Sequence, residues 1–534
     1  MSDGLLNVRW FGARGNDVAD DTDSLQLALD VAQLAAATSS QGTVVYLPRG
    51  CYRVSRNIGV ESRTTSSGMT MPTPVGISIV GDGHEASIVQ ASYPDLIEAD
   101  RRPVAGTGLR RGMISVVGTS SEPARGCSIE RIGLIGPVNR VAFPTDFANS
   151  LLLSQKGVSF CGTQDCTVRS VRTEGFRDEA IYAEVSDGWR VENCIVRRCL
   201  SNAINLNGAW YPADGERTSR DCFIRGNAID ECAASAFQVT GDSFVVTGNT
   251  ARGWPGYPIG ASPVVIDCAF KGIFSDNVIT DYDTSAAGVG CVDVFGSVAP
   301  HQAVIKITNN IFQNVKSDWD EPIQGGGIQF LVTADTLPFA GTALIEGNTF
   351  HDCGRDSPAT GGRFIGVFVA AATARIVVAG NVFRNTVGKN LTDGVFVATG
   401  VPSGVVQVAQ NVYEGVTMPV NSRSANQTLR FEGQRRVVTT LGSTSLALHD
   451  ELVIVYVNGL VSLILPPASA FVSGRRQLIV RNSSLQAGRT ILMPVVAESV
   501  EGGNTVVGRG RCKVLEAVDL GTGLFAWFVV SKIT

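Results

Sequence analysis

The sequence predicts an all-β protein built as a parallel β-helix. The main observation is a short phrase, an Asn followed by apolar residues, that recurs eight times between residues 191 and 412. The copies are VENCI (Asn193), RGNAI (Asn227), TGNTA (Asn249), SDNVI (Asn277), TNNIF (Asn310), EGNTF (Asn348), AGNVF (Asn381) and AQNVY (Asn411). Repeats at intervals of 22 to 38 residues indicate stacked units, with loops of variable length between fixed strands.

The second observation is the period of the apolar residues in each repeat. They alternate in twos, as in strands, and lack helical spacing. A buried Asn at the same turn of every coil hydrogen-bonds the coils above and below it, which explains why a polar residue recurs. The alternative is a β-sandwich with ordinary Gly-Asn turns, but sandwiches rarely repeat one phrase so often.

The composition is typical of a folded, β-rich protein. Of the 534 residues, 59 are Gly and only 17% are charged. The net charge of −5 argues against a nucleic acid partner. No apolar run reaches membrane-spanning length, and the first residues have neither the basic flank nor the apolar segment expected of a secretion signal.

The 12 Cys residues are predicted to be reduced. Cys166, Cys194 and Cys222 recur at intervals of 28 residues beside strand phrases, as small apolar residues stacked inside the coil would. No Cys/His grouping has the spacing of a metal site, so we expect neither a metal nor another cofactor.

Four segments are expected from the order of these patterns. Residues 1–60 form an N-terminal cap with a strand, a helix and a hairpin. Residues 61–422 form the β-helix, and the polar residues 423–440 form a linker. Residues 441–534, which contain about seven strand runs, form a C-terminal β-sandwich-like module.

Two parts of the sequence resemble known families. The words NVRWFGARGNDVADDTDSLQLALD, GTVVYLPRGCYRV and ISIVGDGHEASIV resemble the start of the pectate-lyase-like β-helix superfamily over about ninety residues. This resemblance implies a right-handed β-helix whose N-terminal helix covers the open edge strands.

The words VNGLVSLILPPAS, SGRRQLIVRNSS and TGLFAWFVVS look like the C-terminal β-module of phage tail fibres and tailspikes. That resemblance implies a homotrimer in a virion tail, folded in the host cytoplasm, with a module that trimerises the protein or binds carbohydrate. A secreted, extracellular protein is the alternative.

Each coil also carries a second strand of the form apolar-x-apolar. The flanking apolar residues point into the coil, so x points outward. Stacking the copies predicts a polar stripe of Asn205, Gln238, Asp267, Asp293 and Gln329. In later coils the same place holds Phe368 and Phe396, so the stripe is confined to the middle of the β-helix.

Asp267 and Asp293 are the candidate catalytic pair. In the register just given, their backbones lie about 5 Å apart, which suits a retaining glycosidase. A slip of two residues, placing Asp267 opposite Phe295, gives about 8 Å and suits an inverting one. Two close carboxylates also raise one pKa and supply a general acid. A solvated polar face or a cation site are the alternatives.

Aromatic residues in loops near the stripe are predicted to stack on sugar rings. We expect them to bind substrate together with Asn205, Gln238 and Gln329, although loop packing or a trimer interface would also use them. These aromatic residues are Trp210, Trp254, Tyr282 and Trp319. The nearby carboxylates that compete with the pair are Glu231, Asp281, Asp283, Asp320 and Glu321.

The sequence thus predicts a tailspike-like depolymerase that binds and hydrolyses a bacterial surface polysaccharide, either capsule or O-antigen. One alternative is a lyase or epimerase acting on a uronate polymer, with Tyr182, Lys271 and Arg225 as candidate groups. The other is a receptor-binding spike or adhesin without catalytic activity. The fold alone does not decide among them.

Overall fold

The structure is a computed structural model, which describes part of the chain. The described backbone comprises residues 4–38, 42–64, 69–92, 112–119, 121–137, 156–207, 219–254, 261–284, 290–296, 303–315, 326–330, 339, 341–354, 364–369, 375–386, 391–397, 404–416, 418–422, 427–432, 434–438 and the strands named below beyond residue 440. Side chains are described in the same ranges up to residue 416, except at 267–270, 296, 326, 364–365, 391–392 and 404–405.

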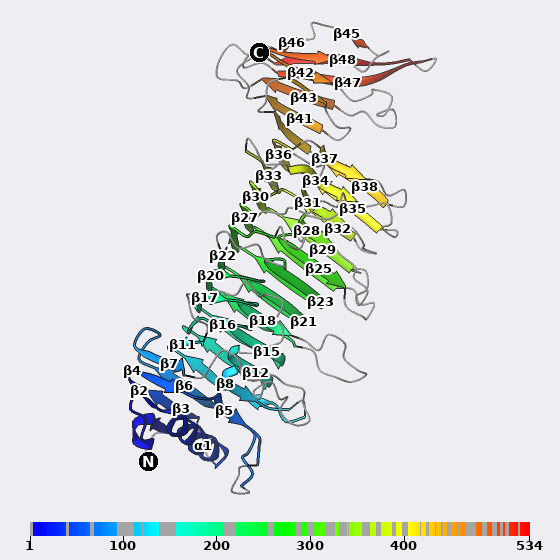
Figure 1. The fold of residues 1–534 in the computed structure, drawn as a ribbon. Helices are drawn as coiled ribbons and strands as arrows, with labels where there is room; N and C mark the ends of the chain where they lie inside the picture. Colours follow the sequence, from blue (N-terminus) through cyan, green and yellow to red (C-terminus); the bar gives the residue numbers. More distant parts are fainter. Residues whose placement is uncertain are drawn as a thin grey trace. The chain divides into compact units, whose positions relative to one another are not determined.

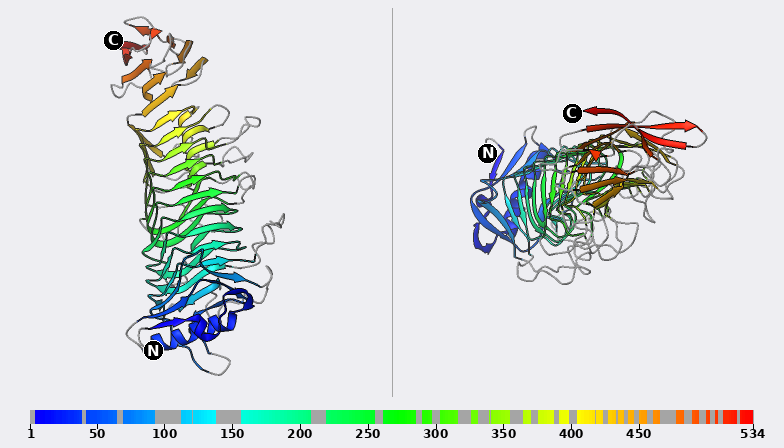
Figure 2. Two further views of the ribbon diagram at one scale, coloured as in Figure 1. Left: turned by 90° about the vertical axis from the view of Figure 1, so that its left-hand side faces the viewer. Right: turned by 90° about the horizontal axis from the view of Figure 1, so that it is seen from above.

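The chain divides into two compact units. The N-terminal unit comprises residues 1–305 and 332–337, and the C-terminal unit comprises residues 306–331 and 338–534. In each unit, parallel strands stack coil upon coil (Figures 1 and 2), which confirms the predicted parallel β-helix.

The N-terminal unit contains three stacks of parallel strands. Stack 1 consists of β5 (Ile58–Glu61), β8 (Gly112–Val117), β12 (Lys156–Gln164), β15 (Ile181–Asp187), β18 (Ile204–Asn207), β21 (Phe237–Thr247), β23 (Val264–Ser275) and β25 (Val292–Gly296).

Stack 2 consists of β1 (Leu5–Asn7), β3 (Thr43–Leu47), β6 (Ile77–Gly81), β10 (Ser128–Glu130), β13 (Thr167–Arg169), β16 (Arg190–Glu192), β19 (Cys222–Arg225) and the second halves of β21 and β23. Stack 3 consists of β2 (Asn16–Asp20), β4 (Gly50–Val54), β7 (Ser87–Ala91), β11 (Gly133–Ile135), β14 (Arg172–Glu174), β17 (Ile195–Cys199), β20 (Ala228–Cys232), β22 (Thr250–Gly253) and β24 (Val278–Thr280). The short strand β9 (Ala124–Arg125) pairs with the end of β12, and β26 (Ala303–Thr308) crosses the boundary between the units.

The C-terminal unit continues the same architecture. Its three stacks are β28 (Gly326–Phe330), β31 (Phe364–Val369), β34 (Leu391–Val397) and β37 (Met418–Ser422); β29 (Gly341–Glu346), β32 (Arg375–Ala379), β35 (Gly404–Ala409) and β38 (Gln427–Glu432); and β27 (Ile311–Gln313), β30 (Thr349–His351), β33 (Val382–Arg384), β36 (Val412–Glu414) and β39 (Gln434–Val438). The segment 423–440, expected as a linker, therefore contains two paired strands.

The last part of the C-terminal unit mixes parallel and antiparallel pairs. From β39, parallel pairing passes to β41 (Asp450–Val455) and β43 (Gln477–Asn482), after which β47 (Cys512–Gly521) and β48 (Leu524–Ile533) pair antiparallel. The remaining strands are β40 (Gly442–Ser445), β42 (Leu460–Ile464), β44 (Arg489–Met493), β45 (Ser499–Glu501) and β46 (Val506–Val507).

The core consists of rows of apolar side chains, each row made of residues that are partners in successive strands. In stack 2 every second side chain points inward, because side chains alternate along a strand. The central row is at most 3% exposed and comprises Val45, Ile79, Ile129, Val168, Val191, Ile224, Val246 and Phe274.

A ladder of buried Asn side chains connects the coils, as predicted. The Asn249 amide oxygen accepts hydrogen bonds from the backbone N–H and the side-chain amide of Asn227, both at 2.9 Å. Asn277 receives the same pair of bonds from Asn249. In the C-terminal unit an equivalent ladder comprises Asn310, Asn348, Asn381 and Asn411.

Asn193 was wrongly predicted to belong to this ladder. It is exposed and has a φ of 54°, whereas its neighbour Cys194 is buried and donates its backbone N–H to Asn227 at 2.9 Å. In the phrase VENCI the ladder position is thus held by Cys. Cys166, Cys194 and Cys222 are buried free thiols, as predicted, and burial raises the pKa of Cys194 and Cys222 to about 12.

Aromatic rings form a second ladder inside the C-terminal unit. The ring centroids of Phe350 and Phe383 are 5.0 Å apart with an interplanar angle of 4°, and Phe383 stacks on Tyr413 in the same way. Gly366 makes room for this stack, because a Cβ atom there would lie 2.2 Å from the Phe383 ring. Stacked rings of this kind contribute beyond their buried area.

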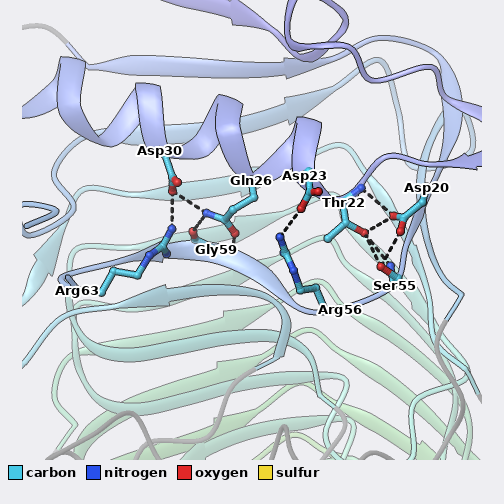
Figure 3. A network of polar contacts seen from close by, with 9 residues as sticks. All are labelled: Asp20, Thr22, Asp23, Gln26, Asp30, Ser55, Arg56, Gly59 and Arg63. Carbon is cyan, nitrogen blue, oxygen red and sulfur yellow. Dashed lines mark hydrogen bonds and ion pairs between the residues drawn. The ribbon is translucent and has the colours of Figure 1, made fainter. Parts of the chain in front are cut away.

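Helix α1 (Thr22–Thr38) covers the edge of β5 in the N-terminal unit (Figure 1). Its apolar face is buried, as the spacing of Leu25, Leu29 and Ala32 predicts. Its polar face carries Gln26, which donates to the Gly59 carbonyl at 2.8 Å and accepts from the Gly59 N–H at 3.0 Å (Figure 3). Gln33, two turns later, donates to the Glu61 carbonyl at 2.8 Å. These amides form the hydrogen bonds that a neighbouring strand would otherwise make with β5.

Charged and hydroxyl side chains hold the helix in place (Figure 3). Arg63 binds Asp30 at 2.6 Å, and Arg56 binds Asp23 at 2.5 Å. The Asp20 carboxylate accepts the N–H of Thr22, the first helical residue, at 3.0 Å. The Thr22 hydroxyl in turn accepts the Ser55 N–H at 2.7 Å, which fixes the helix start against the end of β4.

We expect Asn249→Ala to destabilise the fold by about 3 kcal/mol or more, because it leaves buried ladder groups unpaired on both sides. The midpoints of thermal and urea denaturation, followed by circular dichroism, measure the effect. The control is Asn193→Gly, at an exposed left-handed position that glycine tolerates. Equal destabilisation by both variants would contradict a structural role for the ladder.

Candidate functional site

Two rows of residues on stack 1, two positions apart along each strand, form the candidate site. The first row comprises Ser115, Ser159, Tyr182, Asn205, Gln238, Val265 and Asp293, each the Cα partner of the next. The structure therefore brings the predicted residues Asn205, Gln238 and Asp293 into one row. Val265 occupies the place that was predicted for Asp267.

The second row lies two residues further along the same strands. It contains the partners Cys161, Glu184 and Asn207, and further along Thr240, Asp267 and Phe295. The backbone of Asp267 has its place in this row, whereas its side chain lies outside the described residues. The register that aligned Asp267 with Asp293 is thus wrong, and the register shifted by two residues is the observed one.

The physical reason is that both triplets within Val264–Cys268 fit the apolar-x-apolar form, and a slip of two leaves every side chain on the same face. The backbones of Asp267 and Asp293 consequently lie about 8 Å apart, one coil and two residues from each other.

Asp293 is a buried carboxyl group. Its side chain is only 4% exposed, and this burial raises its pKa from 3.8 to about 7. The Ser262 hydroxyl and the Gly290 backbone N–H face the carboxyl group and lower the pKa by smaller amounts. Asp293 is therefore partly protonated near neutral pH, which is the state that a general acid requires.

A buried ion network adjoins the first row at β12 and β15. The Lys156 side chain is fully buried, and its Nζ lies 2.7 Å from Asp178 and contacts Glu179. The same ammonium group lies 4.2 Å from the ring centroid of Tyr182. The Glu179 carboxylate also accepts a hydrogen bond from the Asn205 amide at 3.0 Å, so the network continues into β18.

Tyr182 connects the two rows. Its hydroxyl donates to Glu184 at 2.9 Å and accepts from the Asn207 amide at 3.3 Å. Burial, and then the charge of Glu184, raise the pKa of Tyr182 well above its ordinary value. The phenol is thus a poor base in this state.

Four buried polar atoms on these rows have no protein partner. They are Asn205 Oδ1, Asn207 Oδ1, Thr240 Oγ1 and Asp293 Oδ1. A buried polar group normally has a hydrogen-bond partner, so such a group points to a bound water or ligand. The distribution of these atoms over successive coils fits an extended ligand better than a single small molecule.

The predicted aromatic residues have different fates. Tyr282 is fully buried inside the coil, packed against Gly253 and near Cys199 and Cys232, so its prediction as a sugar-binding residue is wrong. It follows the left-handed turn at Asp281, which directs it inward. Trp254 is partly buried. Trp210 and Trp319 lie outside the described residues, as do the candidate carboxylates Asp320 and Glu321.

Gln329 lies in the C-terminal unit. It is 1% exposed in β28, and its partner in the next strand is Phe368, which pairs in turn with Phe396. This register agrees with the predicted replacement of the polar stripe by Phe.

The competing carboxylates Glu231 and Asp281 both occupy left-handed backbone positions. Each follows a ladder Asn by four residues and has a φ of 57°. Glu231 lies in stack 3 and accepts a hydrogen bond from Arg198 at 2.8 Å, whereas Asp281 is exposed. Asp283 is partly buried. A left-handed turn favours Asp, which gives Asp281 a structural reason to be there.

Several site residues were not predicted from the sequence. Ser159 could have been found, because Val158-Ser159-Phe160 has the same triplet form in an earlier coil. Lys156 and Glu179 lie outside the triplets, and only the three-dimensional contacts connect them to the site. In the described parts of the chain, no cluster of three His, Cys, Asp or Glu side chains is placed to hold a metal ion, and no helix is long and apolar enough to span a membrane.

Comparisons with known proteins identify the fold. Residues 5–100 match the family described as rhamnogalacturonase A/epimerase, pectate lyase-like, and residues 156–340 match the right-handed β-helix region family. A 49-residue segment, 9% of the chain, is 51% identical to alginate lyase 7 of Azotobacter vinelandii, and this segment spans only 5% of that protein.

Solved structures that resemble the chain in fold include a mannuronan epimerase module and a DFA-IIIase. The A-module of mannuronan C-5 epimerase AlgE6 from Azotobacter vinelandii has a TM-score of 0.51 at 16% identity, covering 80% of this chain and 98% of that one. DFA-IIIase from Arthrobacter chlorophenolicus A6 has a TM-score of 0.50 at 14% identity, covering 76% and 94%. Together with the family matches, these structures identify the fold of the chain as the pectate-lyase-like right-handed parallel β-helix.

Proposed function

We propose that this protein is a carbohydrate-active enzyme that hydrolyses a bacterial surface polysaccharide on the two outward rows of stack 1. The observation that carries the proposal is the buried Asp293 carboxyl group, whose pKa of about 7 suits a general acid, on a face with unpartnered polar atoms. The names of the similar proteins, an alginate lyase and a mannuronan epimerase, support action on a polysaccharide.

Two carboxyl groups are sufficient for glycoside hydrolysis. Asp293 would donate its proton to the oxygen of the leaving sugar, and Asp267 would accept a proton from the attacking water. The backbone spacing of about 8 Å leaves room for that water and favours inversion at the anomeric carbon.

A lyase or epimerase acting on uronate has less support from the geometry. Such an enzyme needs a base and a cation that neutralises the substrate carboxylate. The pKa of Tyr182 is raised, and Lys156 is already held by Asp178 and Glu179. Arg225 binds Glu192 at 2.9 Å in stack 2. A binding spike without activity is the remaining alternative.

We also propose that the chain functions as a homotrimeric spike of a phage tail, on the strength of its C-terminal sequence words. Sedimentation equilibrium is expected to give three times the chain mass of 56.3 kDa. A monomer at micromolar concentration would contradict the trimer and leave the hydrolase proposal standing.

We expect Asp293→Asn to reduce polysaccharide cleavage by roughly 10²- to 10⁴-fold, because the variant has no proton to give to the leaving sugar. Asp267→Asn is expected to cause a similar loss. A reducing-end assay on bacterial capsules and O-antigens measures both. The matched controls are Glu231→Gln and Asp281→Asn, which alter carboxylates at left-handed positions outside stack 1 and are expected to retain activity.

The outcomes of this assay separate the alternatives. Full activity of both stack 1 variants would refute the proposed pair. Products absorbing near 232 nm would indicate a lyase. Tight binding without new reducing ends in the wild type would indicate a binding spike.

Burial of Asp293 also predicts how stability depends on pH. The pKa is about 7 in the folded protein and 3.8 in the unfolded chain, so ionisation costs the fold roughly 4 kcal/mol. Below pH 3.8 Asp293 is protonated in both states, and the folded protein does not bear this cost. As the pH rises from 3.8 to about 7, the free energy of unfolding falls by this amount. We therefore expect Asp293→Asn to raise the melting temperature at pH 8 and to leave it nearly unchanged at pH 4. An equal shift at both values would argue against a buried, ionising Asp293.

A further inference from the structure

The two rows of stack 1 present hydrogen-bond acceptors to a ligand. The Asn205 amide group donates through Nδ2 to Glu179, and that of Asn207 donates through Nδ2 to Tyr182. These bonds fix the orientation of both amides and leave both Oδ1 atoms buried without a protein partner. A ligand satisfies these atoms only by supplying donors, such as hydroxyl, amide or ammonium groups.

The charges on this face disfavour a ligand that carries carboxylates. Asp178, Glu179 and Glu184 are all carboxyl groups of the network. The network's ammonium group, on Lys156, is fully buried and is held between Asp178 and Glu179. It is therefore not placed to receive a carboxylate from a ligand. A uronate unit here would bring its negative charge against carboxylates and carbonyl oxygens in a poorly solvated site, where repulsion is strong.

We infer that these rows bind a saccharide rich in hydrogen-bond donors and free of carboxylates, that is a neutral or amino-sugar polymer and not a uronate polymer. The inference rests on the proposed function, since it names the substrate class of the same site. It differs from what the names of the alginate lyase and the mannuronan epimerase would suggest. Donors supplied by sugar hydroxyl or amino groups would complete the bonds that Asn205 and Asn207 leave open.

The test is a binding experiment with the Asp293→Asn protein on immobilised capsule and O-antigen polysaccharides of known composition. Each uronate-containing polymer is printed beside its carboxyl-reduced form. We expect binding to neutral or amino-sugar polymers, and tighter binding to the reduced form within each matched pair. Raising NaCl from about 50 to 500 mM should weaken the binding of a neutral polymer less than twofold. It should weaken the binding of an amino-sugar polymer more strongly, because salt screens charge.

Variants connect the binding to the acceptors. Introducing Asn205→Ala into the Asp293→Asn protein is expected to weaken binding roughly 3- to 10-fold, as for the loss of a hydrogen bond. Asn207→Ala, at a partly buried position, repeats the test where Asn205→Ala perturbs folding. The matched control is Thr250→Ala, on the exposed face of β22 in stack 3, which should bind like its parent.

Each unfavourable outcome has a distinct meaning. Preference for the native uronate form, or unchanged affinity in both Asn variants, would overturn the inference, while the reducing-end assay would still decide the hydrolase proposal. Binding to none of the printed polysaccharides would overturn the inference and the proposed function together.

Discussion

In-register hydrogen bonding between successive coils determines which residues of this protein are neighbours. Asn227 contacts Asn249, 22 residues later, and Asn249 contacts Asn277, 28 residues later, because each occupies the same position of its coil. A property that suits one position is thus repeated along the stack at about 4.8 Å. The apolar core rows, the Asn ladder and the stacked rings of Phe350 and Phe383 all follow from this constraint.

The same constraint explains what the sequence could and could not reveal. The Asn ladder was predictable because it obeys one rule in every coil, and it failed only at Asn193, where Cys194 takes the position. The register of Asp267 was not predictable, since a period of two is unchanged by a slip of two. The inward position of Tyr282 depends on the turn before it.

Contacts between residues that share no repeated pattern also could not be predicted from the sequence. Lys156 meets Glu179 and Tyr182 because a loop of unrelated sequence places Glu179 next to β12. The fold was therefore predictable nearly throughout the described β-helix, whereas the candidate site was predictable only at positions that repeat. Asn205, Gln238 and Asp293 are such positions.

Low solvent access explains two chemical properties of the candidate site, the raised pKa of Asp293 and the open hydrogen-bond acceptor of Asn205. Removing water from Asp293 raises its pKa and keeps a proton available near neutral pH. Removing water from Asn205 leaves an acceptor that a donor-bearing ligand can satisfy. A substrate that fills this face would deepen the desolvation of Asp293, so binding and proton availability are expected to reinforce each other.

The glutamine contacts of α1 have a consequence for how the protein behaves at high concentration. An uncovered terminal strand is a template on which a second molecule can add its own strand, and repeated addition produces fibres. At β5 the outward backbone groups of Gly59 and Glu61 are already occupied by Gln26 and Gln33. A side-chain amide forms hydrogen bonds with one or two backbone groups, but it does not present a new row of backbone N–H and C=O groups with which another strand could pair. At this strand, the N-terminal unit is therefore protected against end-to-end polymerisation.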